Sequence, residues 1–295
     1  MQTLESLGRH IQSVQDLQSV VKTMKGLAAV NIRQYEQAVD ALQDYTRSLE
    51  LGMQIVLQQA PGAWGFTPSG SDQPVAIVVL GSDQGMCGQF NGRIVTHAAA
   101  RLEESGTGPD QTAALVVGMR AAAEWEASGT RTNVALNVPG SVAEITRRVE
   151  ELLLRIDRWR EERRAGRVWL FHQRPLGGAS YEPHFQQVVP LDATWLDSLR
   201  GRPWPTRMLP MFTMDAQTLF SSITRQYLFT TFYRGLAESL ASENAARLAA
   251  MQAAEKNVEE RLDELTAQYH RRRQNTITEE LLDVTAGFEL LSPGD

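Results

Sequence analysis

The chain has 295 residues, of which 42% are hydrophobic, 22% are charged and 7% are aromatic, and its formal net charge is −6. This balance excludes an intrinsically disordered chain, and the excess of acidic groups makes nucleic acid a poor partner. The single cysteine, Cys87, excludes an internal disulfide framework and a four-thiolate metal site. No uncharged apolar run approaches the ~18 residues of a spanning helix, so we expect no direct membrane insertion.

Apolar residues follow one helical stripe through the first 60 residues. They recur at steps of three and four, and no proline occurs before Pro61. A recurrence of ~3.5 residues is typical of a coiled-coil seam. The sequence therefore predicts one coiled-coil helix over residues 1–60, with a seam that includes Leu7, Ile11, Val14, Leu17, Val21, Met24, Ala28, Ile32, Tyr35 and Val39.

The C-terminal part of the chain has the same character. Residues 214–291 contain no proline, and their only glycines are Gly235 and Gly287. Apolar residues again recur at helical spacing, which predicts a second coiled-coil helix over residues 212–291. Neither amphipathic helix can bury its stripe alone, so we expect the two chain ends to pair antiparallel.

The second helix should extend past the end of the first, because it is longer. Beyond Thr276 it still carries an apolar stripe, and an unpaired apolar helix in water marks an interaction site. The stripe consists of Ile277, Leu281, Val284, Phe288 and Leu291.

The composition changes between the two helices. Residues 61–71 are rich in turn-forming residues, and residues 75–80 form an apolar run typical of a strand buried on both faces of a parallel sheet. Further strands are predicted at 113–117, 133–138 and 168–172, with an edge strand at 181–191, and helices at 90–104, 121–128 and 142–164. This alternation predicts a doubly wound, Rossmann-like α/β domain over residues 72–205.

A glycine-rich loop, residues 81–92, follows the first strand, where doubly wound folds often bind ligands. Its glycine spacing fits neither a dinucleotide fingerprint nor a P-loop, which favours a structural turn over a ligand site. Cys87 could act as a nucleophile and Asp83 as a general base, but a small packing residue and a helix cap explain them more simply. We expect no catalytic residue, no cofactor site and no metal ligand in this chain.

Basic residues cluster at two places on the helices. Lys22 and Lys25 lie on the first helix, and 271–273 is a run of three arginines on the second. Residue type alone favours a solvated helix face over a surface that docks on acidic partners.

Several motifs together resemble the γ subunit of F-type ATP synthases, and the resemblance covers essentially the whole chain. Residues 11–14, 21–25 and 27–29 are similar to the first helix of that family. The loop Ser-Asp-Gln-Gly-Met-Cys-Gly-Gln-Phe-Asn at 82–91 resembles the family's Ser-Asp-Arg-Gly-Leu-Cys-Gly-Gly-Leu-Asn. Residues 241–251 and 265–281 carry the most specific similarity.

The resemblance implies a central rotor shaft that couples ion flow through a membrane ring to ATP synthesis or hydrolysis. Catalysis would belong to the β subunits. The implied partners are the α and β subunits of the head, the ε subunit and the membrane c-ring. The implied location is the cytoplasmic face of a bacterial inner membrane, where the chain would be held through the complex.

The resemblance also implies partner contacts, and it reverses the interpretation of the basic positions. Lys22, Met24 and Lys25 match the region that faces an acidic segment of β. Arg247 matches a family arginine. Two further groups match the collar contact and the sleeve at the top of the head, respectively: Arg273, Gln274 and Thr278, then Leu281, Phe288 and Leu291.

Some positions depart from the common pattern. Gln84, Gln89 and Phe90 replace arginine, glycine and leucine in the loop, and Gly26 lies within a helix at ~1 kcal/mol below alanine in helix propensity. The pattern is similar to the divergent N-type bacterial ATPases. Two alternatives stay open from the residues alone: a coiled-coil adaptor and a nucleotide-binding enzyme of the doubly wound class.

Overall fold

The computed structural model describes residues 3–60, 73–162 and 165–291, with the backbone alone at 109 and 288–291. The chain divides into two compact units, residues 1–27 with 248–295, and residues 28–247. Two helices contribute to both units, α1 (Leu4–Ala41) and α7 (Ala216–Leu291). The turn-rich segment predicted at 61–71 lies outside the described residues.

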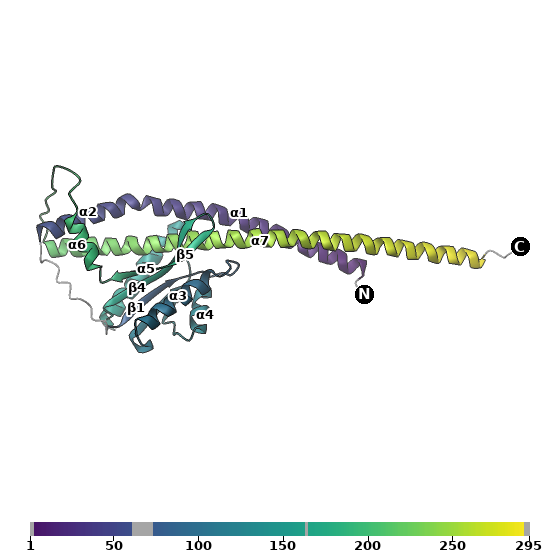
Figure 1. Cartoon of the computed structure of the whole chain (residues 1–295), viewed down its shortest axis with the longest axis horizontal. Coiled ribbons are helices and arrows are strands. Elements are labelled where there is room, and N and C mark those ends of the chain that lie inside the picture. The colour runs from purple at the N-terminus through teal and green to yellow at the C-terminus, as the bar shows by residue number, and fades with distance from the viewer. Residues whose placement is uncertain (1–2, 61–72, 163–164, 292–295) are drawn as a thin grey trace. The chain divides into compact units, whose positions relative to one another are not determined.

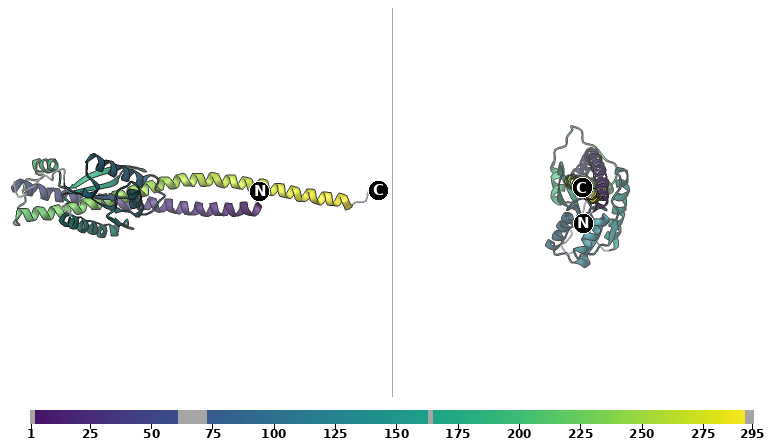
Figure 2. Two further views of the ribbon diagram at one scale, coloured as in Figure 1. Left: turned by 90° about the horizontal axis from the view of Figure 1, so that it is seen from below. Right: turned by 90° about the vertical axis from the view of Figure 1, so that its right-hand side faces the viewer.

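In the first unit, α1 and α7 run side by side and antiparallel (Figure 2). The Lys25 ammonium pairs with the Glu255 carboxylate across the two helices. Apolar side chains at steps of seven or fourteen residues are buried between them, namely Leu7 and Val21 of α1 and Met251, Val258 and Leu265 of α7. The predicted antiparallel pairing of the chain ends is confirmed.

The seam register differs from the prediction at one place. Leu17 is 51% exposed, whereas Gln18 is half-buried between Val14 and Val21. A strict seven-residue repeat places positions 14, 18, 21 and 25 in the seam, so hydrophobicity alone selected the wrong neighbour. Leu17 therefore belongs to the outer surface of the helix.

The second unit also contains antiparallel contacts between the two long helical ends of the chain. Asn31 donates to the Asn244 amide oxygen at 3.3 Å, and the Tyr45 hydroxyl donates to Gln226 at 3.2 Å. One uninterrupted helix was predicted over 1–60, but the structure has a break at Leu42, after which α2 (Gln43–Gln59) begins. The Leu42 N–H donates to an oxygen only three residues back, so one tighter turn separates two helices.

A five-stranded sheet lies in this unit, and its strand order is β3-β2-β1-β4-β5. The strands β1, β2, β3 and β4 are parallel, and β5 pairs antiparallel with β4. Their bounds are β1 (Val75–Leu80), β2 (Thr112–Val117), β3 (Val134–Leu136), β4 (Arg167–Gly177) and β5 (Ser180–Val189). The predicted parallel core and edge strand are confirmed, although β4 is longer than predicted.

Helices cover both faces of the sheet, as predicted for a doubly wound domain. On one face lie α3 (Phe90–Glu104) and α4 (Met119–Ala127), which bury Ile94, Ala98 and Trp125 against β1 and β2 (Figure 1). The other face packs on α5 (Val142–Glu162) and on α7. That α7 itself covers this face was not predicted, because its sequence fits a coiled-coil helix throughout. Between α3 and β2 lies a short 3₁₀ helix, Pro109–Gln111.

Gly235 allows α7 to approach the sheet closely. A Cβ atom at this position would lie 3.0 Å from Leu170 Cδ2 and 3.6 Å from His172 Nδ1. A side chain here would push the helix away from β4. The glycine that looks like a helix defect in the sequence therefore has a packing role.

A further helix, α6 (Ala193–Gly201), was not predicted. Asp192 caps it by accepting from the Thr194 N–H at 2.9 Å. It packs with α2 and the start of α7 around Met53, Leu196 and Phe220. Within the described residues, no helix is both long and apolar enough to cross a bilayer.

Candidate functional site

The glycine-rich loop satisfies its polar groups internally. The Asn91 amide oxygen accepts from the Ser82 N–H at 2.9 Å, and the Asn91 amide donates to the Ser82 hydroxyl at 2.8 Å. That hydroxyl donates in turn to the Gln84 carbonyl at 2.8 Å. A loop that binds phosphate through its side chains and N–H groups would direct them outward, so these contacts favour the structural turn.

Asp83 holds the ends of three strands together. Its carboxylate follows β1 and accepts from the Met119 N–H after β2 at 2.9 Å and from the Val138 N–H after β3 at 3.0 Å. Both oxygens of the carboxylate are therefore used within the domain. This arrangement gives the acidic residue at this position a structural role.

Cys87 is buried and lies against α7. Its side chain packs with Phe90, Ala246 and Tyr181, and its sulfur lies 3.6 Å from the Ser82 hydroxyl. Burial raises the pKa of the Cys87 thiol, which keeps it protonated and unsuited to act as a nucleophile. The loop is thus a clamp that fixes α7 to the sheet within the second unit.

A second contact between β4 and α7 is polar and buried. His172 on β4 lies 2.9 Å from one oxygen of the Glu238 carboxylate, and Arg234 donates to the other at 2.8 Å. Although burial by itself raises the pKa of Glu238, its bonds to His172 and Arg234 outweigh burial and lower it. His184 of β5 stacks edge-on against His172, with ring centroids 5.1 Å apart.

We expect this cluster to make stability depend on pH. Burial, His172 and Arg174 lower the pKa of His184 from 6.5, so the unfolded chain binds this proton more readily than the folded chain. The free energy of unfolding should therefore rise as pH increases toward 6.5, and its contribution from His184 should be complete above that value. Urea unfolding at pH 5 and pH 7 should show a smaller difference for His184→Gln than for the wild type.

A matched control for this experiment is His10→Gln, which removes an exposed histidine from the first unit. It should retain the wild-type difference between pH 5 and pH 7. An unchanged pH dependence in His184→Gln would show that the environment of His184 does not oppose its protonation.

Two of the predicted partner-contact residues already have partners in the chain. The Arg247 guanidinium lies 2.6 Å from the Glu243 carboxylate, and its side chain is only 14% exposed. Burial raises the pKa of Glu243 even though Arg247 acts against this shift. Lys25 is held by Glu255, so its charge is largely used between α1 and α7.

Other predicted contact residues are free to meet a partner surface. Lys22, Arg273 and Gln274 are exposed, and so is Thr278, whose hydroxyl donates to the Gln274 carbonyl at 2.9 Å. Met24 is half-buried. The side chains of Phe288 and Leu291 lie outside the described residues.

The apolar tail of α7 is exposed from residue 277 to residue 286. Thr276 is still half-buried, but the next ten residues of the helix are exposed. Figure 2 shows α7 continuing past the N-terminal end of α1. The exposed apolar side chains are Ile277, Leu281, Leu282 and Val284, which are 46% to 68% exposed.

A second apolar stripe was missed by the sequence analysis. Leu17, Val20 and Leu27 are each more than half exposed, and with Met24 they follow the spacing i, i+3, i+7, i+10 on the outside of α1. The sequence carries this spacing, but the predicted seam includes Leu17 and Met24. An exposed apolar stripe beside Lys22 extends the candidate partner surface.

In the part of the chain that the structure describes, no group of three or more His, Cys, Asp or Glu side chains could hold a metal ion.

The comparison with protein families shows which family the chain belongs to. The model of the ATP synthase family matches residues 3–291, which is nearly the whole chain. This chain belongs to the ATP synthase gamma family. It is 28% identical over 301 residues to the ATP synthase gamma chain of Rubrobacter xylanophilus, with all of both chains covered.

Other relatives of the gamma chain agree. The ATP synthase gamma chain of Thiobacillus denitrificans is 25% identical over 282 residues, covering 94% of this chain and 95% of that one. A chain of the Euglena gracilis mitochondrial ATP synthase, solved as OSCP/F1/c-ring in rotational state 3, matches with a TM-score of 0.66. That match covers 98% of this gamma chain and 94% of the other, at 16% identity, and it confirms the fold.

Proposed function

We propose that this gamma chain is the central rotor shaft of an F-type ATP synthase. The observation that carries the proposal is the exposed apolar tail of α7, a surface that needs a partner. The family match over residues 3–291 supports the same function. The solved relatives are rotor and central-stalk chains. The partners would be the α and β subunits, the ε subunit and the c-ring.

The shaft would act through its surface, and the catalytic residues would belong to the β subunits. An asymmetric pair of helices that turns inside a ring of subunits presents different side chains to each one in sequence. The outer stripe of α1, with Leu17, Val20 and Leu27, gives α1 an apolar side beside the charged Lys22. A difference in contact free energy between faces is what shifts each catalytic site between its states.

The contact residues are part of the proposal. Lys22, Met24, Arg273, Gln274, Thr278 and Leu281 support it by their exposure or partial exposure. Lys25 and Arg247 would first have to exchange their partners Glu255 and Glu243. The remaining proposed contacts are Phe288 and Leu291.

We further propose that the chain has three domains, residues 1–60, 72–205 and 212–291. The middle domain would form the foot of the rotor. The gamma chain would lie at the cytoplasmic face of a bacterial inner membrane, as a peripheral part of the complex. The departures at Gln84, Gln89 and Phe90 support the N-type subtype. The coupling ion would be selected by other subunits.

Reconstitution tests the proposal. The chain, mixed with its cognate α and β subunits, should remain bound to them through gel filtration and should support their ATPase activity. Clean separation from a correctly assembled head would contradict the proposal and favour the adaptor alternative. A nucleotide-dependent rise in the melting temperature of the isolated chain would instead favour the enzyme alternative.

A further inference from the structure

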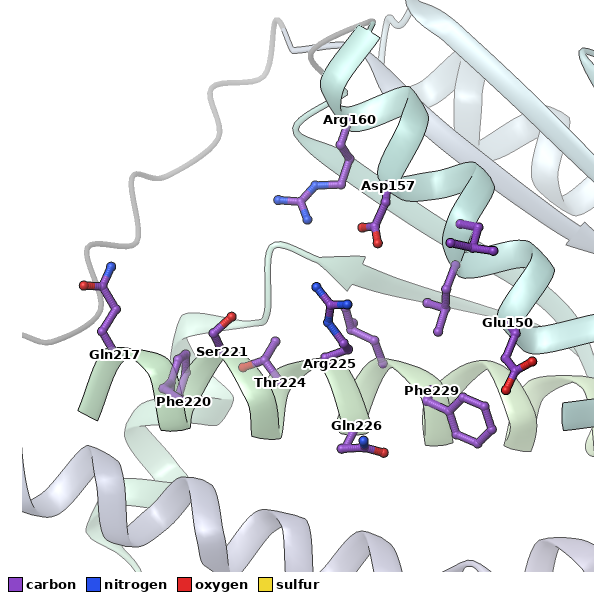
Figure 3. A pocket seen from close by; sticks show the side chains of 13 residues that line it. Glu150, Asp157, Arg160, Gln217, Phe220, Ser221, Thr224, Arg225, Gln226 and Phe229 are labelled. Carbon is purple, nitrogen blue, oxygen red and sulfur yellow. The ribbon is translucent and has the colours of Figure 1, made fainter. Parts of the chain in front are cut away.

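A groove lies between α5 and α7 in the second unit (Figure 3). Its volume is about 830 Å³, and apolar side chains of both helices line it, among them Leu153, Leu228 and Phe229. Leu154, which also lines the groove, is 68% exposed. The groove is thus an apolar surface built by two neighbouring helices.

The charges along this groove are ordered. Glu150 and Arg160 lie at opposite ends of the α5 side, and Asp157 of α5 and Arg225 of α7 lie between them (Figure 3). None of the ion pairs seen in the described residues uses these four groups. Glu150 and Arg160 are ten positions apart, which corresponds to about 15 Å of helix, or about three turns.

We propose that the groove binds a three-turn amphipathic helix from another subunit of the ATP synthase complex. A third helix can pack into a groove that two helices line with apolar side chains. Such a helix carries apolar residues at i, i+3 or i+4, and i+7 on the side that faces the groove. Its N-terminus lies at Glu150 and its C-terminus at Arg160, because a carboxylate favours the positive end of a helix and a guanidinium the negative end. The bound helix therefore runs in the same direction as α5.

This proposal rests on the proposed rotor function. The accessibility of an introduced cysteine tests it in the assembled complex. Cys87 is the single native cysteine and is 2% exposed, so Leu154→Cys introduces one reactive thiol at the groove. A maleimide should label this thiol at least tenfold more slowly in the assembled enzyme than in the isolated chain. A photoreactive maleimide at the same position should cross-link to a helix of another subunit.

The matched control is Glu162→Cys, an exposed residue of α5 that does not line the groove. Its labelling should change less than twofold on assembly. Equal labelling of Leu154→Cys in both states, or a cross-link to a second copy of this chain, would overturn the groove proposal while leaving the rotor proposal intact. Failure of the wild-type chain to assemble would overturn both.

Charge reversal gives a second readout. Glu150→Lys should restore fast labelling of the groove cysteine in the assembled enzyme, because it sets a cation against the positive end of the bound helix. The same reversal at Glu162 should leave the protection unchanged. Protection that survives Glu150→Lys would contradict the proposed orientation.

Discussion

Replacing Ile277, Leu281 and Val284 with serine should weaken binding of this gamma chain to its α and β subunits by roughly 100-fold. These side chains are 46%, 62% and 68% exposed, and α1 does not cover them. Burying each against a partner contributes about 1 kcal/mol even when burial is partial, and about 3 kcal/mol corresponds to roughly 100-fold in the dissociation constant. Titration of the labelled chain with assembled α and β subunits measures this constant.

The control keeps the helix and changes only polar groups. Glu279, Glu280 and Asp283 lie in the same segment, and their replacement by Gln, Gln and Asn should change the dissociation constant less than threefold. Circular dichroism should show equal helix content in both triple variants. Equal affinity of the serine variant and the wild type would mean that the apolar tail is not the surface that the head grips.

The predictable part of this structure is the part set by local periodicity. The run at 75–80 predicts β1 to the residue, and the helix at 90–104 coincides with α3, because a continuous apolar strand and a helical stripe each have their own spacing. The antiparallel pairing also follows from the sequence, since two long amphipathic stripes must cover each other.

Other features depend on contacts between distant segments, which periodicity does not encode. The packing of α7 on the sheet at Gly235 requires knowledge of Leu170, 65 positions away. The seam error at Leu17 arose because one extra apolar residue stood beside the true seam position. The pairing of Arg247 with Glu243 and of Lys25 with Glu255 could not be separated from exposed charge by residue type alone.

The glycine-rich loop has one feature that its sequence predicts and one that depends on distant contacts. Its sequence indicates a strand-to-helix turn, but the reason for its first glycine is tertiary. A Cβ at Gly81 would lie 2.2 Å from Ala121 Cβ and 2.8 Å from Asn91 Oδ1. The loop can hold its bonds to Asn91 only because β1 and α4 touch at this point without a side chain between them.

Gly81→Ala should therefore lower the free energy of unfolding of the α/β domain by about 3 kcal/mol. Neither Ala121 nor the backbone of β1 can move without disturbing a fully buried core, and overpacking of this kind costs about 1–3 kcal/mol or more. Urea unfolding followed by tryptophan fluorescence reports on this domain, because Trp125, Trp159 and Trp169 are buried in it. Gly85→Ala is the control, because a Cβ there meets nothing within 4 Å, and its effect should stay below about 0.5 kcal/mol.

A double variant separates the clash from any other effect of the new methyl group. Ala121→Gly removes the nearest atom and by itself costs about 1 kcal/mol, since glycine is a poorer helix former than alanine. If the two Cβ atoms collide, Gly81→Ala with Ala121→Gly must be less destabilised than the sum of the two single variants. Strict additivity would place the cost of Gly81→Ala elsewhere, in the contact with Asn91 and the loop that clamps α7.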